Sequence, residues 1–224
     1  MNMDGCEFSD FLGGVCRAFE AGEERNIAIA QELNRFEELI HRVDAKKAKK
    51  AFKAEVPGLI HLASALDLAE ASDSFGLTDG LRRIANRLNW SQFYVEDDWN
   101  RGFIDRVANG SLVGPIGIIE SEELVLDVFL LGPDTLYPPH GHAAIEIYYI
   151  LGGHPRFLVG NLPWKEKPPG SFSFHPSGVV HATRTFREPM LAIIAWRGDI
   201  QSPSWHMSDR SQSRDRSNNL KRLW

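Results

Sequence analysis

Residues 138–153 read PPHGHAAIEIYYILGG, and this stretch decides how the second half of the chain folds and what it can bind. His140 and His142 lie two positions apart, so in an extended segment both side chains point to the same side. A turn through residues 143–144 would then bring Glu146 back beside them on the next strand. The stretch therefore predicts two strands joined by a tight turn, carrying three side chains that bind metals.

A third histidine comes from further along the chain, because residues 170–185 read GSFSFHPSGVVHATRT and contribute His181. Three imidazoles and one carboxylate suit one divalent transition metal ion such as zinc, iron, manganese, cobalt or nickel. Four such ligands leave positions open for water or substrate. A His-x-His pair alone is weak support for a metal site, so the longer pattern carries the prediction.

The segments that surround this stretch are short, rich in β-branched and aromatic residues, and bounded by Gly or Pro. They recur at roughly ten-residue intervals, which predicts an antiparallel sandwich or barrel. The segments are residues 114–121, 123–132, 145–153, 156–161, 170–176, 179–186 and 189–198.

The first ~110 residues instead show the three- and four-residue spacings of helices. Pro57 suits the first turn of a helix, Thr78 suits an N-cap, and Asn109-Gly110 suits a helix end. The clearest apolar stripe consists of Ile29, Leu33, Phe36, Ile40 and Val43. We therefore expect a mainly β, α+β protein with a helical region at 1–112, a β-barrel at 113–207 and a polar tail at 208–224 that is mobile.

The composition excludes several classes of protein. The chain has 224 residues, a net charge of −5, 43% hydrophobic and 25% charged residues, which is typical of a globular protein and offers no basic face for nucleic acid. No apolar run reaches the ~18–20 residues of a membrane span, and the first residues do not resemble a signal peptide. Two cysteines, Cys6 and Cys16, are too few for a disulfide framework. We expect a cytoplasmic protein that acts on a small molecule. The sequence does not fix the oligomeric state, although a helical arm beside a barrel often mediates homodimers.

The metal-binding pattern resembles the two motifs of the cupin superfamily, over residues 114–200. The first motif is matched by His140, His142, Glu146 and Gly153, and the second by Gly170, Pro176, Gly178 and His181. Thr185 stands where the second motif usually ends in Asn, and Gly132 lies two residues further upstream than the common spacing. The resemblance implies the cupin double-stranded β-helix and a bound metal. His175 is expected to pack or to cap a turn.

Within the cupins, the chain looks like the dimethylsulfoniopropionate lyases. The resemblance rests on LGPDTLYPPHGHAAIEIYYILGG at residues 131–153, on AIIAWRG at residues 192–198, and on the helical region that precedes the barrel. It implies cleavage of a sulfonium zwitterion to dimethyl sulfide and acrylate by β-elimination. By position it implies Tyr148 as the catalytic base, Tyr137 as a second catalytic and substrate-binding tyrosine, and Trp196 as a substrate-binding wall.

The chemistry of that reaction agrees with these residue types. The proton lies next to a carboxylate and is weakly acidic, so the reaction needs a metal to absorb developing charge and a strong base. A phenol has a pKa of about 10, and a nearby dication lowers it. Aromatic faces hold cations by about 1–2 kcal/mol when desolvated. Further aromatic candidates for the cationic end are Trp90, Phe93, Tyr94, Trp99 and Trp164.

Three other functions remain open at this point. An iron-dependent cupin dioxygenase uses the same ligands, so the motif does not exclude it. A non-enzymatic, metabolite-binding cupin has no need of the phenol of Tyr148. A regulatory sensor lacks support, because residues 1–110 show no helix-turn-helix with a basic face.

Overall fold

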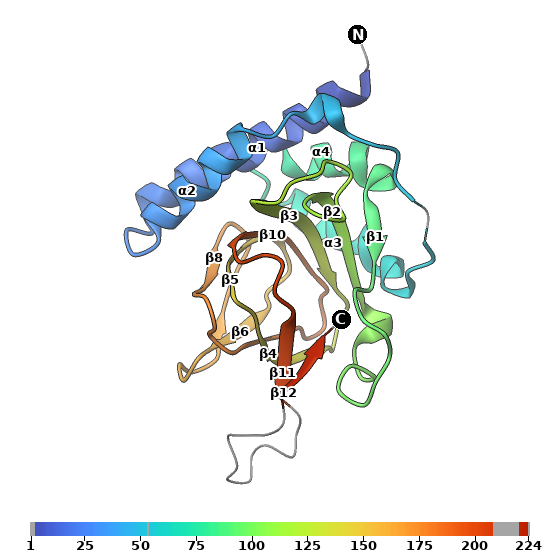
Figure 1. The fold of residues 1–224 in the computed structure, drawn as a ribbon, viewed down its shortest axis with the longest axis vertical. Helices are drawn as coiled ribbons and strands as arrows, with labels where there is room; N and C mark the ends of the chain where they lie inside the picture. The colour runs from blue at the N-terminus through green and yellow to red at the C-terminus, as the bar shows by residue number, and fades with distance from the viewer. Residues whose placement is uncertain (1–2, 53, 208–219, 224) are drawn as a thin grey trace.

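A computed structural model describes residues 3–52, 54–207 and 220–223 of the chain. Two six-stranded antiparallel sheets face each other, and helices cover the outer face of the first sheet (Figure 1). This is the mainly β architecture with a helical N-terminal region, and the cupin-like arrangement of two sheets, that the sequence predicts.

The first sheet has the strand order β1-β2-β3-β10-β5-β8. Its strands are β1 (Asn89–Ser91), β2 (Val107–Val113), β3 (Leu124–Leu131), β5 (Ala144–Gly152), β8 (Phe172–His175) and β10 (Met190–Gly198).

The second sheet has the order β12-β11-β4-β9-β6-β7. Its strands are β4 (Leu136–Gly141), β6 (Arg156–Val159), β7 (Lys165–Glu166), β9 (His181–Arg184), β11 (Ser204–Met207) and β12 (Leu220–Leu223). The tight turn after β4 therefore carries the chain from one sheet to the other.

The first sheet is buried on both faces, which explains why its central strands read as nearly continuous apolar runs. Along β5, Ile147 and Tyr149 pack outwards with the helices, whereas Tyr148 points into the barrel. On β3, Val128 likewise packs with the helices and Phe129 points inwards. One set of alternate residues thus holds the helices, and the other set lines the barrel.

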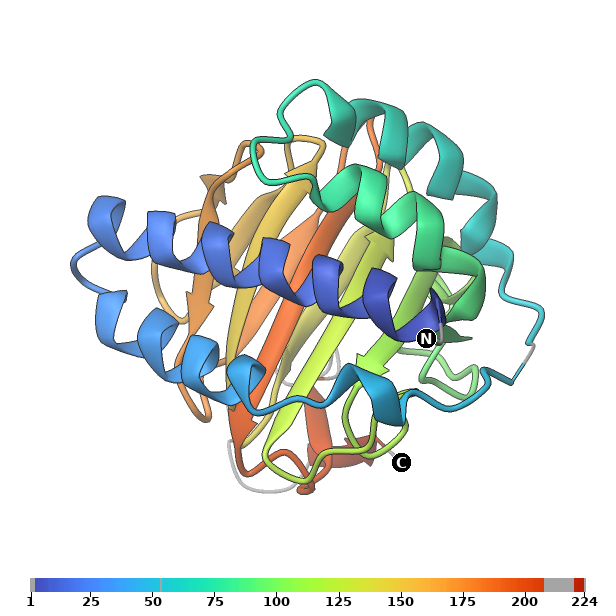
Figure 2. The same cartoon turned by 90° about the horizontal axis from the view of Figure 1, so that it is seen from above.

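The helices cross the outer face of this sheet, and Figure 2 shows α1 and α2 lying over its strands. The α-helices are α1 (Met3–Arg25), α2 (Ala30–His41), α3 (Leu62–Glu70) and α4 (Leu77–Ile84), and the 3-10 helices are η1 (Ala45–Lys47), η2 (Pro57–His61), η3 (Ala85–Arg87) and η4 (Ile104–Arg106). The stripe predicted on α2 is confirmed, because Leu33, Phe36 and Ile40 are buried. Pro57 does stand in the first turn of η2.

Two local predictions about helices are wrong. Thr78 is not an N-cap, because α4 begins at Leu77 and the carboxylate of Asp73 accepts the N–H groups of Leu77 and Thr78, at 3.1 and 2.8 Å. Asn109 and Gly110 do not end a helix but lie inside β2. Gly110 is needed there because Leu88 and Trp90 pack against its backbone, where a Cβ would come within 3.0–3.1 Å of their side chains.

Six of the seven predicted strand segments contain a strand, and the first does not. Residues 114–121 form a turn rather than a strand, joined to β2 by a bridge between Val113 and Ile119 and by backbone hydrogen bonds from Ile118 and Ile119. The expected mobile tail falls mostly on residues 208–219, outside the described part of the chain, while residues 220–223 form β12. The division at residues 112 and 207 stays a prediction.

Thr185 closes the barrel where the cupin motif usually has Asn. Its hydroxyl donates to the carbonyl oxygen of Gly132 at 2.5 Å and accepts the N–H of Thr135 at 3.0 Å. The displaced Gly132 and the substituted Thr185 are therefore two halves of one contact between the loop before β4 and the end of β9.

Gly153, the last residue of the first motif, is required by both conformation and space. Its φ of +82° favours glycine, and a Cβ there would overlap the carbonyl oxygen of Pro189. Gly170 has a similar φ of +78°, but no atom lies within 4 Å of the position of its missing Cβ. An alanine at residue 170 would therefore suffer only the strained backbone conformation, whereas an alanine at residue 153 would also overlap Pro189.

We expect Gly153→Ala to lower the free energy of unfolding by about 3–5 kcal/mol, because strain and overlap with Pro189 add. Gly170→Ala, the matched control, should cost only about 1–2 kcal/mol, the price of a left-handed conformation. Urea denaturation of both variants measures the difference. If both variants lost the same free energy of unfolding, the backbone at Pro189 would have moved aside at no cost.

Candidate active site

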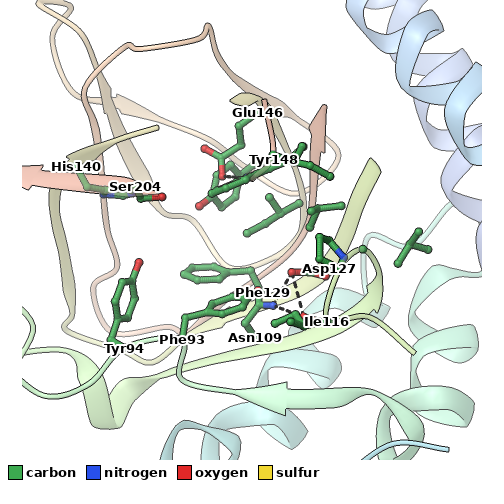
Figure 3. Close-up of a pocket in the computed structure, with 18 of the residues that line it drawn as sticks. Phe93, Tyr94, Asn109, Ile116, Asp127, Phe129, His140, Glu146, Tyr148 and Ser204 are labelled. Atoms are coloured by element: carbon green, nitrogen blue, oxygen red, sulfur yellow. Dashed lines mark hydrogen bonds between the residues drawn. The ribbon is translucent and has the colours of Figure 1, made fainter. Parts of the chain in front are cut away.

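The inward-facing side chains of the two sheets enclose a cavity of about 180 Å³. Its aromatic lining consists of Phe93, Tyr94, Phe129, Tyr137, Tyr148 and Trp196, and its polar lining includes Asn109, Ser111, Asp127, His140, Glu146 and Ser204. Figure 3 shows Glu146 and Tyr148 in one part of this pocket, with Asp127 and Asn109 apart from them on another wall. The cavity therefore has two polar regions separated by apolar surface.

Three buried histidines of this region share one orientation. Each imidazole places its Nδ1 at 2.8–3.0 Å from a backbone carbonyl oxygen two residues away. A carbonyl oxygen only accepts, so Nδ1 carries the proton and Nε2 of a neutral ring is left with its lone pair. The pairs are His140 with Pro138, His142 with Ala144, and His181 with Val179.

Two of these Nε2 atoms point at the carboxylate of Glu146. The Nε2 atoms of His142 and His181 lie 3.3 and 3.2 Å from Oε2 of Glu146, and candidate ligand atoms of the three residues all lie within 4.8 Å of one another. An imidazole lone pair and a carboxylate oxygen are both acceptors, so they cannot bond to each other. Nε2 of His181 has no hydrogen-bond partner in the structure. This donor set fits a divalent cation.

His140 stands at the edge of the cluster. Its ring lies 4.3 Å from that of His181 between centroids, but it is not among the three residues whose ligand atoms group most tightly. Burial, followed by the charge of His181, lowers the pKa of His140 well below its usual value, so the ring is neutral and able to bind a metal. The structure therefore brings all four expected ligands into one buried region, three of them within the tightest group.

Glu146 is held in place by two donors. Trp196 donates its Nε1–H to Oε1 at 2.6 Å and stacks on the ring of His142, and His175 donates its Nδ1–H to Oε2 at 2.5 Å. Nε2 of His175 lies 3.0 Å from the hydroxyl of Ser173, and burial lowers the pKa of His175 to about 4. Burial alone would raise the pKa of Glu146, but the facing imidazoles lower it well below its usual range.

His175 is a functional residue that the sequence reasoning missed, because we expected it to pack or to cap a turn. It reaches Glu146 because β5 and β8 pair with Glu146 directly opposite His175. That register becomes visible only once the two strands are known to be neighbours. Trp196 lines the cavity as expected, and in addition it orients the carboxylate.

Tyr148 lies in the cavity on the same face of β5 as Glu146, fully buried against the rings of Phe129, Phe157 and His175. Burial, followed by the charge of Glu146, raises the pKa of its phenol well above 10. Tyr149 points the other way and packs on Phe172. Of these two tyrosines, only Tyr148 faces the side where the candidate metal ligands lie.

Tyr137 lies across the cavity, with its ring 4.2 Å from that of His140. Its hydroxyl is hydrogen-bonded to the hydroxyl of Tyr94, and burial raises the pKa of both phenols. Of the other aromatic candidates, Phe93 and Tyr94 line the cavity. Trp99 packs behind them against Tyr94 and stacks on His206.

Trp90 and Trp164 do not reach the cavity. Trp90 is buried under the first sheet, where its Nε1–H donates to the carbonyl oxygen of Ala85, and Trp164 is exposed. His154 forms an exposed pair with Glu188. These residues belong to packing and surface rather than to the site.

The other polar region of the cavity is centred on Asp127. Its Oδ2 accepts hydrogen bonds from Nδ2 of Asn109 at 2.6 Å and from the hydroxyl of Ser111 at 3.3 Å. Burial raises the pKa of this carboxyl to about 7, and hydrogen bonding by Asn109, Ser111 and the backbone of Leu112 keeps it from rising further. This group was not predicted from the sequence, because the pairing of β2 with β3 becomes visible only in the structure.

Comparison with known proteins identifies relatives of most of the barrel and part of the helical region. The model of the dimethylsulfoniopropionate lyase family matches residues 28–192. The dimethylsulfoniopropionate lyase DddQ of Ruegeria pomeroyi is 39% identical over 113 residues, which are 50% of this chain and 56% of that protein. The putative dimethylsulfoniopropionate lyase DddL of Cereibacter sphaeroides is 31% identical over 182 residues, 77% of this chain and 74% of that protein.

The crystal structure of DddQ from Ruegeria pomeroyi superimposes with a TM-score of 0.63 at 29% identity, over 84% of this chain and 95% of that chain. The likeness therefore includes the helical layer as well as the barrel. Within the described residues, none of the helices has the length and apolar character needed to cross a membrane.

The buried carboxyl of Asp127 predicts a pH-dependent stability. An unfolded aspartate titrates near a pKa of about 3.9, so between there and about pH 7 the folded protein binds one proton more than the unfolded chain. The free energy of unfolding should therefore fall as the pH rises through this window.

Asp127→Asn removes this titration. From pH 4.5 to pH 8, its free energy of unfolding should rise relative to the wild type by about 3 kcal/mol. Urea denaturation at both pH values measures the change, with the exposed Asp105→Asn as a control. Parallel pH profiles for the Asp127 variant and the wild type would show that this carboxyl is not perturbed.

Proposed function

This chain belongs to the dimethylsulfoniopropionate lyase family, a family of carbon–sulfur lyases, and we propose that it cleaves dimethylsulfoniopropionate to dimethyl sulfide and acrylate. The reaction is a β-elimination. A base takes the proton next to the carboxylate, the electrons of that C–H bond form the C=C bond of acrylate, and the C–S electron pair leaves with sulfur as neutral dimethyl sulfide. The sulfonium charge is neutralised by the C–S electron pair, so dimethyl sulfide leaves as a neutral molecule. The carboxylate charge stays on acrylate, and the base holds the proton.

The observation that carries this proposal is the geometry around Glu146. His142 and His181, whose Nδ1 atoms face backbone carbonyl oxygens, turn their Nε2 atoms towards the carboxylate of Glu146, and a buried phenol lies on the same face of the same strand. The two Nε2 lone pairs cannot bond to the carboxylate oxygen that they face, whereas a cation between them would bind all three atoms. A cupin that only bound a metabolite would not require a phenol at residue 148.

We propose one divalent transition metal ion, of zinc, iron, manganese or cobalt, held by His140, His142, Glu146 and His181. When bound, such an ion supplies positive charge that polarises the substrate carboxylate as a Lewis acid and lowers the pKa of a nearby phenol. Trp196 and His175 keep the carboxylate of Glu146 oriented by donating to its two oxygens. Donors of this kind strengthen metal sites in proteins.

Tyr148 is the proposed base. It needs to be a phenolate to accept the proton, and burial together with the charge of Glu146 opposes that form. A positive charge held by the four proposed ligands would instead lower the pKa of this phenol. The dry surroundings of Phe129 and Phe157 keep water from taking the proton in place of the base.

Tyr137 and Trp196 are the proposed substrate-binding residues. Tyr137, fixed by its hydrogen bond to Tyr94, places its ring beside His140, while Trp196 forms the wall next to Glu146. Their faces, with those of Phe93 and Phe129, offer cation–π attraction to a sulfonium. A cytoplasmic location and a homodimer remain parts of this proposal, the first supported by the free thiols of Cys6 and Cys16.

Incubation of the purified protein with dimethylsulfoniopropionate should release dimethyl sulfide and acrylate in equal amounts, without consumption of oxygen. Removal of the metal with a chelator should abolish the release, and one of the four proposed ions should restore it. Headspace analysis and metal analysis measure both outcomes. Oxygen consumption with another substrate would identify a dioxygenase, and binding without turnover would identify a binding protein.

Tyr148→Phe should lower kcat by about 10³-fold, the usual contribution of a general base, while the metal content stays unchanged. Tyr149→Phe is the matched control, because it removes a hydroxyl from the opposite face of the same strand and should leave turnover nearly intact. Headspace dimethyl sulfide and metal analysis of both variants give the comparison. Wild-type turnover in the Tyr148 variant would remove the proposed base.

A further inference from the structure

The second polar region of the cavity is unexplained by metal binding or proton transfer. Asp127 is buried, lines the cavity, and leaves its Oδ1 without a hydrogen-bond partner. It interrupts the apolar strand LVLDVFLL at the centre of the first sheet. A carboxylate in such a place costs stability unless something compensates for its charge.

The protein supplies hydrogen bonds to Asp127 but no counter-charge. Asn109 and Ser111 donate to Oδ2, and both are neutral. The residues that line the cavity include no lysine or arginine, and no described lysine, arginine or histidine forms an ion pair with Asp127. The cavity therefore has an excess of negative charge at this wall.

Strand register places Asp127 in the same row as Tyr148. Tyr148 pairs with Ile194 on β10, and Ile194 pairs with Asp127 on β3, so the phenol and the carboxylate project from one row of the sheet. Their Cα atoms are two strand spacings, about 9–10 Å, apart. The metal-binding carboxylate, Glu146, lies in the neighbouring row, opposite Trp196. Figure 3 shows Asp127 on a different wall from Glu146.

The proposed substrate has the matching distribution of charge, with an anion at one end and a sulfonium at the other. A sulfonium has no N–H or O–H, so it cannot form ordinary hydrogen bonds, and its recognition depends on aromatic surface and on opposite charge. Ile194 lies between Asp127 and Tyr148 in this row, and Phe129 and Trp196 add aromatic surface to the lining of the cavity. Asp127 provides the opposite charge.

We propose that Asp127, held by Asn109 and Ser111, is the counter-charge for the cationic end of the substrate and makes the site prefer a sulfonium acid over a neutral thioether acid. This inference rests on the proposed function. It assigns Asp127 to substrate specificity, whereas the His and Glu cluster acts on the carboxylate end. The donors to Oδ2 stabilise the ionised form that this role requires.

The test compares two ligands that share a carboxylate and differ in charge at sulfur: dimethylsulfoniopropionate and 3-(methylthio)propionate. Their dissociation constants are measured by calorimetry at pH 8 on metal-loaded Tyr148→Phe, in which turnover is blocked, and on Tyr148→Phe carrying Asp127→Asn. Asp127→Asn should reduce the preference for the cation roughly tenfold or more and leave the affinity for the neutral acid unchanged. In enzyme with Tyr148 intact, Asp127→Asn should raise KM and change kcat little.

The controls separate this role from a structural one. Asp105→Asn removes the same charge from an exposed site and should keep the preference. Asn109→Ala keeps Asp127 but removes its shorter hydrogen bond, so it should weaken the preference in the same direction even if Asp127→Asn folds poorly.

Each remaining outcome is decisive. An unchanged preference in Asp127→Asn, or equal weakening of both ligands, would overturn the role of Asp127 and leave the proposed function standing. A wild-type protein that neither binds nor cleaves dimethylsulfoniopropionate would instead overturn the proposed function.

Discussion

The carboxylate of Glu146 is the point on which the site depends, because groups from both sheets meet there. His175 and Trp196 of the first sheet donate to its oxygens, while His181 of the second sheet and His142 of the connecting turn present lone pairs to it. Donors on one side fix the carboxylate, and acceptors on the other side leave it in need of a cation. This division follows from the backbone, since each candidate histidine ligand bonds its Nδ1–H to a carbonyl oxygen two residues away.

An ionised carboxylate is costly to bury, and this cavity has two buried carboxyl groups, Glu146 and Asp127. Their surroundings differ. Imidazoles and an indole surround Glu146, and its pKa is lowered, whereas Asp127 has only an amide and a hydroxyl as side-chain donors, and its pKa is raised to about 7. Figure 3 shows the two carboxyl groups in different parts of the cavity. A zwitterion with its charges at opposite ends is the kind of ligand that such a cavity suits.

The sequence predicted those parts of the site that lie close together in the chain. His140, His142, Glu146 and Tyr148 fall within nine residues, and the motif glycines that shape the turns fixed the place of His181. The residues it missed meet across strands. His175 faces Glu146 through the pairing of β8 with β5, and Asp127 meets Asn109 through the pairing of β3 with β2.

Asn109 illustrates why local patterns failed. Asn-Gly is typical of a helix end, and only the packing of Trp90 and Leu88 on Gly110 shows that the pair belongs to a strand. The helical stripe of α2 was predicted because its period is local. The capping of α4 by Asp73 was not predicted, because Thr78 is also a residue type preferred at N-caps and lies nearer to the helical pattern.

The helical layer has a consequence for the barrel that it covers. On β10, Trp196 faces the cavity, while its neighbour Arg197 forms an ion pair with Glu32 of α2. Every second residue of the central strands is committed to the helices in the same way. Loss of the helical layer would therefore expose the apolar outer face of the first sheet, so the barrel depends on these helices to remain folded in water.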